Sequence, residues 1–188
     1  MGGRLILVYG GSGSGKSAWA ERTLLSEAAA AGGRAVYLAT MPDAGDEAAA
    51  RIARHRAMRS RHGAAVGLDF VTAERQADIG GAAVLPGDFV LLEDLGNLLA
   101  NEIWPPTGTG AADVEARVLA GLRVLLDRAA LLVIVSNDIF ADGGGYDPDT
   151  IAYIRSLGAL HRELALLAEQ VVEVVCGIPL VHAFQKGG

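Results

Sequence analysis

Residues 8–24 read VYGGSGSGKSAWAERTL, and the eight residues from Gly10 to Ser17 match the phosphate-binding pattern G-x-x-x-x-G-K-S, called Walker A. The motif requires a strand before the loop and a helix after it. Both are predicted, because residues 5–9 form an apolar run of strand length and residues 17–31 are alanine-rich. A glycine-rich turn that carries Lys-Ser by chance lacks this context. The stretch therefore predicts a nucleotide phosphate loop.

The residue types in the loop suit this chemistry. Glycines let backbone N–H groups point at phosphate oxygens, Lys16 reaches the outer phosphates, and the Ser17 hydroxyl is a ligand for Mg²⁺. The chain has only one other lysine, Lys186, so a lysine inside the loop is not surface decoration. The predicted nucleotide-binding residues of the loop are Gly10, Gly11, Ser12, Gly13, Ser14, Gly15, Lys16 and Ser17.

Length and composition set the outer bounds. The 188 residues predict a single domain, 1–188, and a net charge of −6 argues against a nucleic-acid platform. We see no signal peptide and no apolar run long enough to cross a membrane. The single cysteine, Cys176, excludes an internal disulfide, fits a reducing cytoplasm, and is expected to be a small buried hydrophobe.

Short apolar runs alternate with helix-forming segments along the chain. The predicted strands are 5–9, 35–39, 68–72, 89–92, 131–136, 171–175 and 180–182. The predicted helices are 17–31, 46–61, 113–128 and 148–170, and two glycine-rich or proline-rich loops are expected at 105–110 and 141–148. This alternation predicts an α/β P-loop NTPase with a RecA-like, doubly wound, mainly parallel sheet flanked by helices.

Two strand ends carry polar residues. In VLLED, Glu93 and Asp94 follow an apolar strand, where phosphate-loop proteins place an acid that holds Mg²⁺. Glu93 ranks ahead of Asp94 because it follows the strand immediately, and an ordinary strand-end turn is the alternative. The next predicted strand ends in Ser136-Asn137-Asp138-Ile139, which lacks the Asn-Lys-x-Asp signature of a small GTPase switch.

Residues 45–62, GDEAAARIARHRAMRSRH, form a basic island of five arginines and two acids. In a helix, Arg51, His55, Arg59 and His62 lie on one face. Such a face is either a solvated basic surface or a cluster that attacks a phosphorus atom through an imidazole while guanidinium groups stabilise the phosphate charge. The pattern alone leaves both interpretations open.

Six motifs, taken in order, resemble the bifunctional adenosylcobinamide kinase/adenosylcobinamide-phosphate guanylyltransferase family. They are GGSGSGKS, VYLAT at 36–40, RIARHR at 51–56, VTAE at 71–74, VLLED at 90–94 and IVSND at 134–138. The most specific is the Arg-Ile-x-x-His spacing after YLAT. In that family the histidine of this motif becomes guanylylated, and the matching position is His55. The resemblance leaves His62 as a substrate or phosphate contact.

The resemblance implies two reactions late in coenzyme B12 synthesis. ATP or GTP phosphorylates the aminopropanol hydroxyl of adenosylcobinamide, with Lys16, Mg²⁺ and arginine neutralising charge. GTP then gives GMP to that phosphate through His55, which yields adenosylcobinamide-GDP and pyrophosphate. A covalent intermediate divides one difficult displacement between two anions into two easier ones. The resemblance further implies a cytoplasmic homo-oligomer, a trimer.

The segment from 138 to 161 departs from the family pattern. Asp138 stands where members usually have Glu, and the loop after it lacks the usual Gly-x-Gly-Ile-Val-Pro character. His161 lies in the region where members commonly show Asn. The alternatives are therefore a divergent member with one of the two activities, or a P-loop kinase of another small molecule. A nucleotide-dependent switch is a third class, and it would bind nucleotide with negligible transfer.

Overall fold

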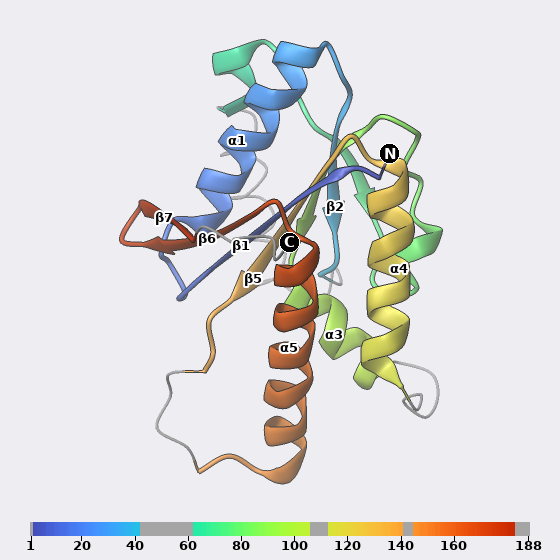
Figure 1. The fold of residues 1–188 in the computed structure, drawn as a ribbon, viewed down its shortest axis with the longest axis vertical. Helices are drawn as coiled ribbons and strands as arrows, with labels where there is room; N and C mark the ends of the chain where they lie inside the picture. Colours follow the sequence, from blue (N-terminus) through green and yellow to red (C-terminus); the bar gives the residue numbers. More distant parts are fainter. Residues whose placement is uncertain (1, 42–61, 106–112, 141–144, 183–188) are drawn as a thin grey trace, which may run out of the picture.

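The computed structural model describes residues 2–41, 62–105, 113–140 and 145–182, which form a seven-stranded sheet with helices on both sides (Figure 1). The strands are β1 (Arg4–Gly10), β2 (Ala35–Ala39), β3 (Val71–Glu74), β4 (Phe89–Glu93), β5 (Leu131–Asn137), β6 (Gln170–Val175) and β7 (Ile178–His182). The helices are α1 (Lys16–Ala31), α3 (Leu95–Ile103), α4 (Val114–Arg128), α5 (Pro148–Leu167) and the short 3₁₀ helix η1 (Ile79–Gly81).

The strand order is β3-β2-β4-β5-β1-β6-β7, and every neighbouring pair is parallel except β6 with β7. Parallel pairing brings the carboxyl ends of the central strands to one edge. In the register, Gly10 at the end of β1 pairs with Asn137 of β5, and Ala39 of β2 pairs with Glu93 of β4. The phosphate loop and the acidic strand end therefore share an edge, although 76 positions separate Ser17 from Glu93.

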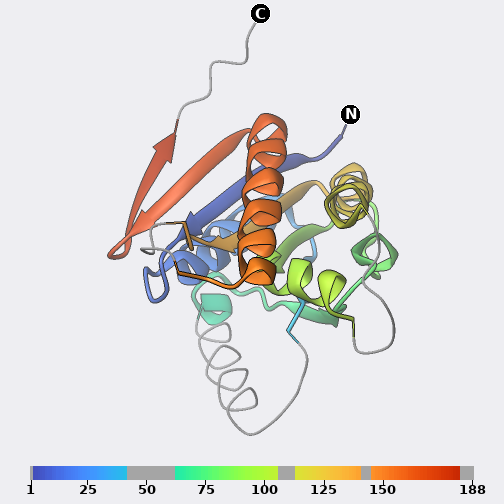
Figure 2. The same cartoon turned by 90° about the horizontal axis from the view of Figure 1, so that it is seen from below.

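Two apolar layers enclose the sheet. Alternate β1 residues Ile6 and Val8 join the α1 side, where they are buried with Leu24 and Leu25. The other face, with Leu5 and Leu7 of β1, is covered by α3, α4 and α5, as the two views show (Figures 1 and 2). Burial on both faces explains why the strands read as continuous apolar runs.

The predicted architecture, a mainly parallel and doubly wound sheet of the P-loop class, is confirmed. The predicted helix 46–61, residues 106–110 of the first predicted loop and residues 141–144 of the second lie outside the described residues. The strand predicted at 68–72 is displaced, since β3 covers Val71–Glu74. Helix α5 ends at Leu167, earlier than predicted, because the chain turns there and Glu169 N donates to the Leu5 carbonyl at 2.8 Å.

Two further features differ from expectation. Helix α3 was not predicted; its nine residues follow Asp94, whose side chain caps the helix by accepting a hydrogen bond from the Asn97 backbone N–H. Cys176 was expected to be buried and is exposed, with φ 50° at the turn between β6 and β7. Among the described residues, no helix is both long and apolar enough to span a membrane.

Candidate active site

The phosphate loop connects β1 to α1 in a conformation that glycine permits. Gly13 and Gly15 have φ values of 72° and 90°, in the left-handed region that side chains with a Cβ rarely adopt. The turn between β6 and β7 supports the loop, because Gly177 N donates to the Ser14 carbonyl at 2.7 Å. A Cβ added at Gly15 would lie 3.3 Å from the Cα of Gly177. Backbone conformation therefore favours glycine at positions 13 and 15, and the close approach of Gly177 favours it further at position 15.

Lys16 is only 7% exposed and lies within the loop, where its Nζ donates to the Gly11 carbonyl at 3.2 Å. Burial lowers the pKa of Lys16, while the charges of Glu93 and Asp94 act in the opposite direction. A buried ammonium with one carbonyl acceptor has donors left for phosphate oxygens.

Ser17 and Glu93 meet across the edge of the sheet. The Ser17 hydroxyl donates to Glu93 Oε1 at 2.6 Å, and Glu93 Oε2 is shielded from solvent without a hydrogen-bond partner among the described residues. Burial is the largest cause that raises the pKa of Glu93, to about 7. The Ser17 hydrogen bond lowers it, the nearby Asp94 and Glu21 carboxylates raise it further, and Lys16 lowers it.

The Ser17 hydroxyl and the Glu93 carboxylate are oxygen ligands that fit a magnesium ion. Mg²⁺ is typically held by one or two protein oxygens together with substrate phosphates, and Ser17 and Glu93 supply a hydroxyl and a carboxylate beside the phosphate loop. A cation here would give the unpaired Oε2 a positive partner. Within the ranges that the structure describes, no group of three or more His, Cys, Asp or Glu side chains could hold a metal by itself.

Asp94 has a different position from Glu93. Its Oδ1 accepts from the Asn97 backbone N–H at 2.6 Å, and its Oδ2 accepts from Asn137 Nδ2 at 3.1 Å. The Asp94 carboxylate thus caps α3 and connects the ends of β4 and β5. The geometry agrees with the sequence-based ranking of Glu93 ahead of Asp94 as the acid that faces Ser17.

Only one member of the basic face predicted in residues 45–62 can be placed. Arg51, His55 and Arg59 lie outside the described residues. His62 lies against α1, where its Nδ1 is 2.7 Å from Glu21 Oε2. Burial lowers the pKa of His62, and the charge of Arg22 lowers it further. Both effects disfavour the protonated form of the imidazole that contacts Glu21.

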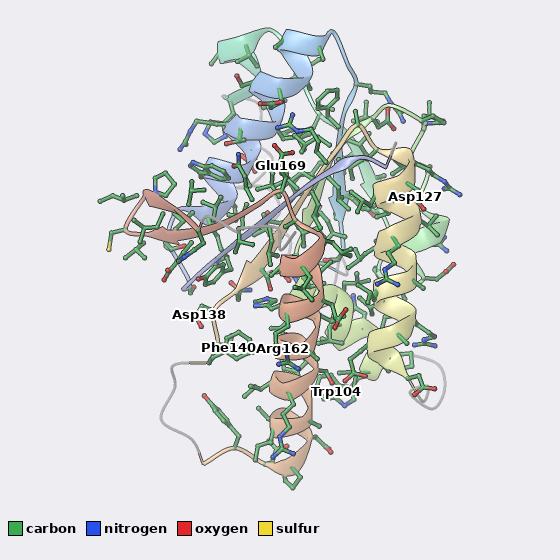
Figure 3. All side chains as sticks on the ribbon, viewed as in Figure 1. Trp104, Asp127, Asp138, Phe140, Arg162 and Glu169 are labelled. Atoms are coloured by element: carbon green, nitrogen blue, oxygen red, sulfur yellow. The ribbon has the colours of Figure 1, made fainter. Side chains whose placement is uncertain are left out.

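The segment that departs from the family pattern begins at the same edge of the sheet. Asp138 N donates to the Gly10 carbonyl at 2.9 Å, and Asp138 and Phe140 lie between the end of β5 and helix α5 (Figure 3). On α5, His161 Nε2 is 2.7 Å from the hydroxyl of buried Ser136 and packs edge-on against Phe140. Burial lowers the pKa of His161, with Asp138 opposing the shift.

Sequence reasoning missed Glu21. It is 2% exposed on α1, four residues after Ser17, so the two side chains share a face of the helix. The signal that could have indicated Glu21 was its position four residues after Ser17 in an alanine-rich helix. That signal is weak, because helix acids are usually solvated.

A glycine-rich loop between a strand and a helix, a buried lysine, and an acid at a neighbouring strand end define a P-loop nucleotide-binding enzyme. The sequence model of the cobinamide kinase / cobinamide phosphate guanyltransferase family matches residues 6–182, and the chain belongs to this family. The resemblance drawn from the six motifs is confirmed, and with it the assignment to enzymes of cobalamin biosynthesis.

Two relatives are each named bifunctional adenosylcobalamin biosynthesis protein CobU, one from Escherichia coli (strain K12) and one from Salmonella typhimurium (strain LT2). Each is 30% identical to this chain, over 93% of the chain and 97% of the relative. Among solved structures, the flagellar accessory protein FlaH from Methanocaldococcus jannaschii is 11% identical with a TM-score of 0.44, over 92% of this chain and 71% of that one. That distant likeness supports no inference about function.

Proposed function

We propose that this chain catalyses both reactions of its family in one domain with one phosphate loop. The first is transfer of a γ-phosphoryl group from ATP or GTP to the aminopropanol hydroxyl of adenosylcobinamide. The second is transfer of GMP from GTP to the resulting phosphate, with release of pyrophosphate. The observation that carries this proposal is the cluster of Lys16, Ser17 and Glu93 at the end of β1 and β4, in a chain of this family.

The phosphoryl transfer step depends on positioning and charge. Lys16 is buried in the loop, so its ammonium meets phosphate oxygens where water screens the interaction weakly. The start of α1 adds its positive dipole end and free N–H groups. Ser17 and Glu93 would hold Mg²⁺, which neutralises negative charge on the phosphates. The four loop glycines and two loop serines would line the phosphates; they are Gly10, Gly11, Ser12, Gly13, Ser14 and Gly15.

The guanylyl transfer step requires a nucleophile, and we assign it to His55. An imidazole nitrogen of His55 attacks the α-phosphorus of GTP, forms a P–N bond, and displaces pyrophosphate. An oxygen of the cobinamide phosphate then attacks the same phosphorus and breaks the P–N bond. Arg51 and Arg59 would stabilise charge on the phosphate, and His62 would contact substrate. These assignments rest on the spacing within residues 51–62 and on the family, because Arg51, His55 and Arg59 lie outside the described residues.

Labelled GTP tests this proposal. Incubation with GTP labelled at the α-phosphorus should leave label on the protein as a phosphoramidate, which acid cleaves and alkali largely spares. Adenosylcobinamide phosphate should then remove the label and produce labelled adenosylcobinamide-GDP. A wild-type protein that never acquires label would contradict the covalent route.

A divergent member with a single activity is the second candidate, and the segment at 138–161 is the observation that favours it. His161, in the region where the family commonly shows Asn, lies 2.7 Å from the Ser136 hydroxyl. Such a protein would acquire the label from GTP and fail to phosphorylate adenosylcobinamide, or the reverse. A P-loop kinase of another small molecule would do neither with these substrates.

The assembly and location of the protein are part of the same proposal. We propose a cytoplasmic homotrimer, on the basis of the family resemblance and of Cys176, which is a free thiol and fits a reducing compartment. Light scattering on the purified protein tests the assembly, and a monomeric mass would contradict it.

A further inference from the structure

Thr40 is a buried residue of the motif VYLAT, and the proposed mechanism gives it no role. It directly follows β2 and is fully shielded from solvent, with an exposure of 0%. A buried hydroxyl is costly unless it is hydrogen-bonded, so the Thr40 side chain is expected to have specific partners. The preceding residue, Ala39, pairs in register with Glu93 of β4. Thr40 therefore lies beside the strand end that carries the proposed magnesium ligand.

The Thr40 side chain binds the main chain of the two acidic residues at the end of β4. Its hydroxyl lies within donating distance of the Glu93 carbonyl, at 3.0 Å, and of the Asp94 carbonyl, at 2.9 Å. The same oxygen accepts from the Asp94 backbone N–H at 2.9 Å. A hydroxyl has one hydrogen and two lone pairs, so the two carbonyls share its hydrogen while the N–H takes a lone pair. The Thr40 backbone N–H adds a bond to the Glu93 carbonyl at 3.1 Å.

Thr40 is itself held by Asn101 of α3. The Asn101 Nδ2 donates to the Thr40 carbonyl at 2.8 Å and to the Gln76 carbonyl at 3.1 Å, so it connects α3 to the segments that follow β2 and β3. The start of α3 is in turn capped by the Asp94 carboxylate. The Thr40 hydroxyl therefore belongs to a set of bonds that joins the ends of β2 and β4 to the start of α3.

The direction of the Glu93 side chain depends on this main chain. Glu93 Oε1 accepts from the Ser17 hydroxyl at 2.6 Å, and Oε2 has no hydrogen-bond partner among the described residues. Apart from the Ser17 bond, the backbone of Glu93 therefore decides where its carboxylate lies. Mg²⁺ demands nearly ideal octahedral geometry, so it tolerates little displacement of a ligand. A carboxylate on a loosened main chain would keep its charge and lose its position.

We propose that Thr40 is a positioning residue for Mg²⁺, because its hydroxyl holds the main chain of Glu93 and Asp94 so that the Glu93 carboxylate faces Ser17. The inference rests on the proposed magnesium site, and it assigns Thr40 no contact with the metal or the nucleotide. Loss of the hydroxyl should weaken what Mg²⁺ adds to nucleotide binding. It should spare the binding that the phosphate loop provides without the metal.

Calorimetric titration of GDP into the full chain, once with Mg²⁺ and once with EDTA, separates these two contributions. The ratio of the Kd in EDTA to the Kd in Mg²⁺ measures what the metal adds. Thr40→Val removes the hydroxyl and keeps a branched side chain, Thr40→Ala removes it with the branch, and Thr40→Ser retains it. Thr72→Val is the matched control, because it makes the same substitution at an exposed residue of β3.

We expect Thr40→Val and Thr40→Ala to lower this ratio about tenfold or more, the usual effect of removing a group that orients a metal ligand. The Kd in EDTA should stay within about threefold of wild type, and Thr40→Ser should retain most of the ratio because it keeps the hydroxyl. In a Glu93→Gln background, Thr40→Val should cause no further loss in the ratio, since Thr40 acts through Glu93. Thr72→Val should match wild type in both titrations.

An unchanged ratio in Thr40→Val would overturn the inference, as would an equal weakening of binding in Mg²⁺ and in EDTA. Equal losses in Thr40→Ser and Thr40→Ala would also overturn it, because these two variants differ by the hydroxyl alone. If Thr40→Val does not fold, as judged by its thermal unfolding, this second pair decides the matter.

Failure of the proposed function gives a different result. If Mg²⁺ adds nothing to GDP binding in the wild type, the magnesium site is absent and the role of Thr40 falls with it. If the ratio depends on Thr40 as expected while no phosphoryl or guanylyl group reaches the corrinoid substrates, only the proposed reactions are wrong. An intact transfer of both groups with a ratio that is insensitive to Thr40 defeats only the role of Thr40.

Discussion

Replacement of Glu93 by glutamine separates the stability of the protein from its function. Burial raises the pKa of this carboxyl group from an ordinary 4.5 to about 7, so the folded state resists its ionisation. The fold bears no such penalty below pH 4.5, where the group is protonated in both states. As pH rises from 4.5 through about 7, the unfolded chain ionises first and the folded state loses stability relative to it.

The size of the effect follows from the shift. Each pKa unit is worth about 1.4 kcal/mol, so the wild-type protein should lose about 3 kcal/mol of unfolding free energy from this group by pH 8. Glutamine cannot ionise, and the loss should be absent from Glu93→Gln. The amide leaves an N–H₂ group at the unpaired Oε2 position, which costs about 1–3 kcal/mol at every pH. The pH dependence therefore discriminates better than the stability at one pH.

Urea unfolding between pH 5 and 8, with EDTA present, measures the effect. His62 and His161 have lowered pKa values and favour stability at higher pH, but they do so in both proteins. The difference between wild type and variant therefore isolates Glu93.

A second set of samples contains Mg²⁺ and nucleotide in place of EDTA. These ligands should stabilise the wild type more at pH 8 than at pH 6 and should stabilise the variant little. Both transferase activities of the variant should also fall. Parallel stability curves across this pH range would refute the reasoning.

Three further predictions concern the loop and the histidines. Lys16→Ala should weaken nucleotide binding at least tenfold by calorimetry and abolish both activities, because one loop serves them; full pyrophosphate release would contradict this. His55→Ala should lose the label from α-labelled GTP and keep kinase activity, whereas His62→Ala should slow labelling without abolishing it; the reverse pattern would assign the carrier to His62. Gly15→Ala should lower the unfolding free energy, measured in urea, by about 1–3 kcal/mol. Gly32→Ala is the control and should cost less, because Gly32 also has a positive φ but has open space around it. Equal losses in the two variants would show that the contact at Gly15 does not matter.

The sheet and its phosphate loop could be predicted because their signals are local. Strands β1, β2, β4, β5 and β6 are five to seven residues long and mostly apolar. Burial on both faces of the sheet favours such runs, so these five strands coincide with runs visible in the sequence. The loop motif fixes its own context of strand and helix. β3 shows the limit of this approach, because Val71 and Glu74 at its ends are exposed and its pairing with β2 decides its position.

The missed features depend on contacts between distant parts of the chain. Helix α3 is short and follows Asp94, an acid that the sequence analysis considered only as a metal ligand or as part of a strand-end turn, and that caps the helix in the structure. Cys176 follows an apolar strand, yet the reversal of the chain into β7 exposes it. Glu21 is indistinguishable from a solvated helix acid until His62, 41 positions later, is brought against it. Local propensity contains no information about these pairings.

The buried Glu93 carboxylate lowers the free energy of unfolding, and bound substrate with its cation is suited to offset this loss. Glu93 is kept out of water, with one oxygen bonded to Ser17 and the other without a hydrogen-bond partner in the described part of the chain, and nearby Asp94 and Glu21 raise its pKa further. Such an arrangement lowers the stability of the protein by itself, since a buried acid without a cation favours unfolding at neutral pH. A cation and the phosphates that accompany it convert that penalty into binding energy, because they stabilise the ionised form in the folded state alone. The fold therefore retains a destabilising carboxylate at the point where the proposed chemistry needs a cation.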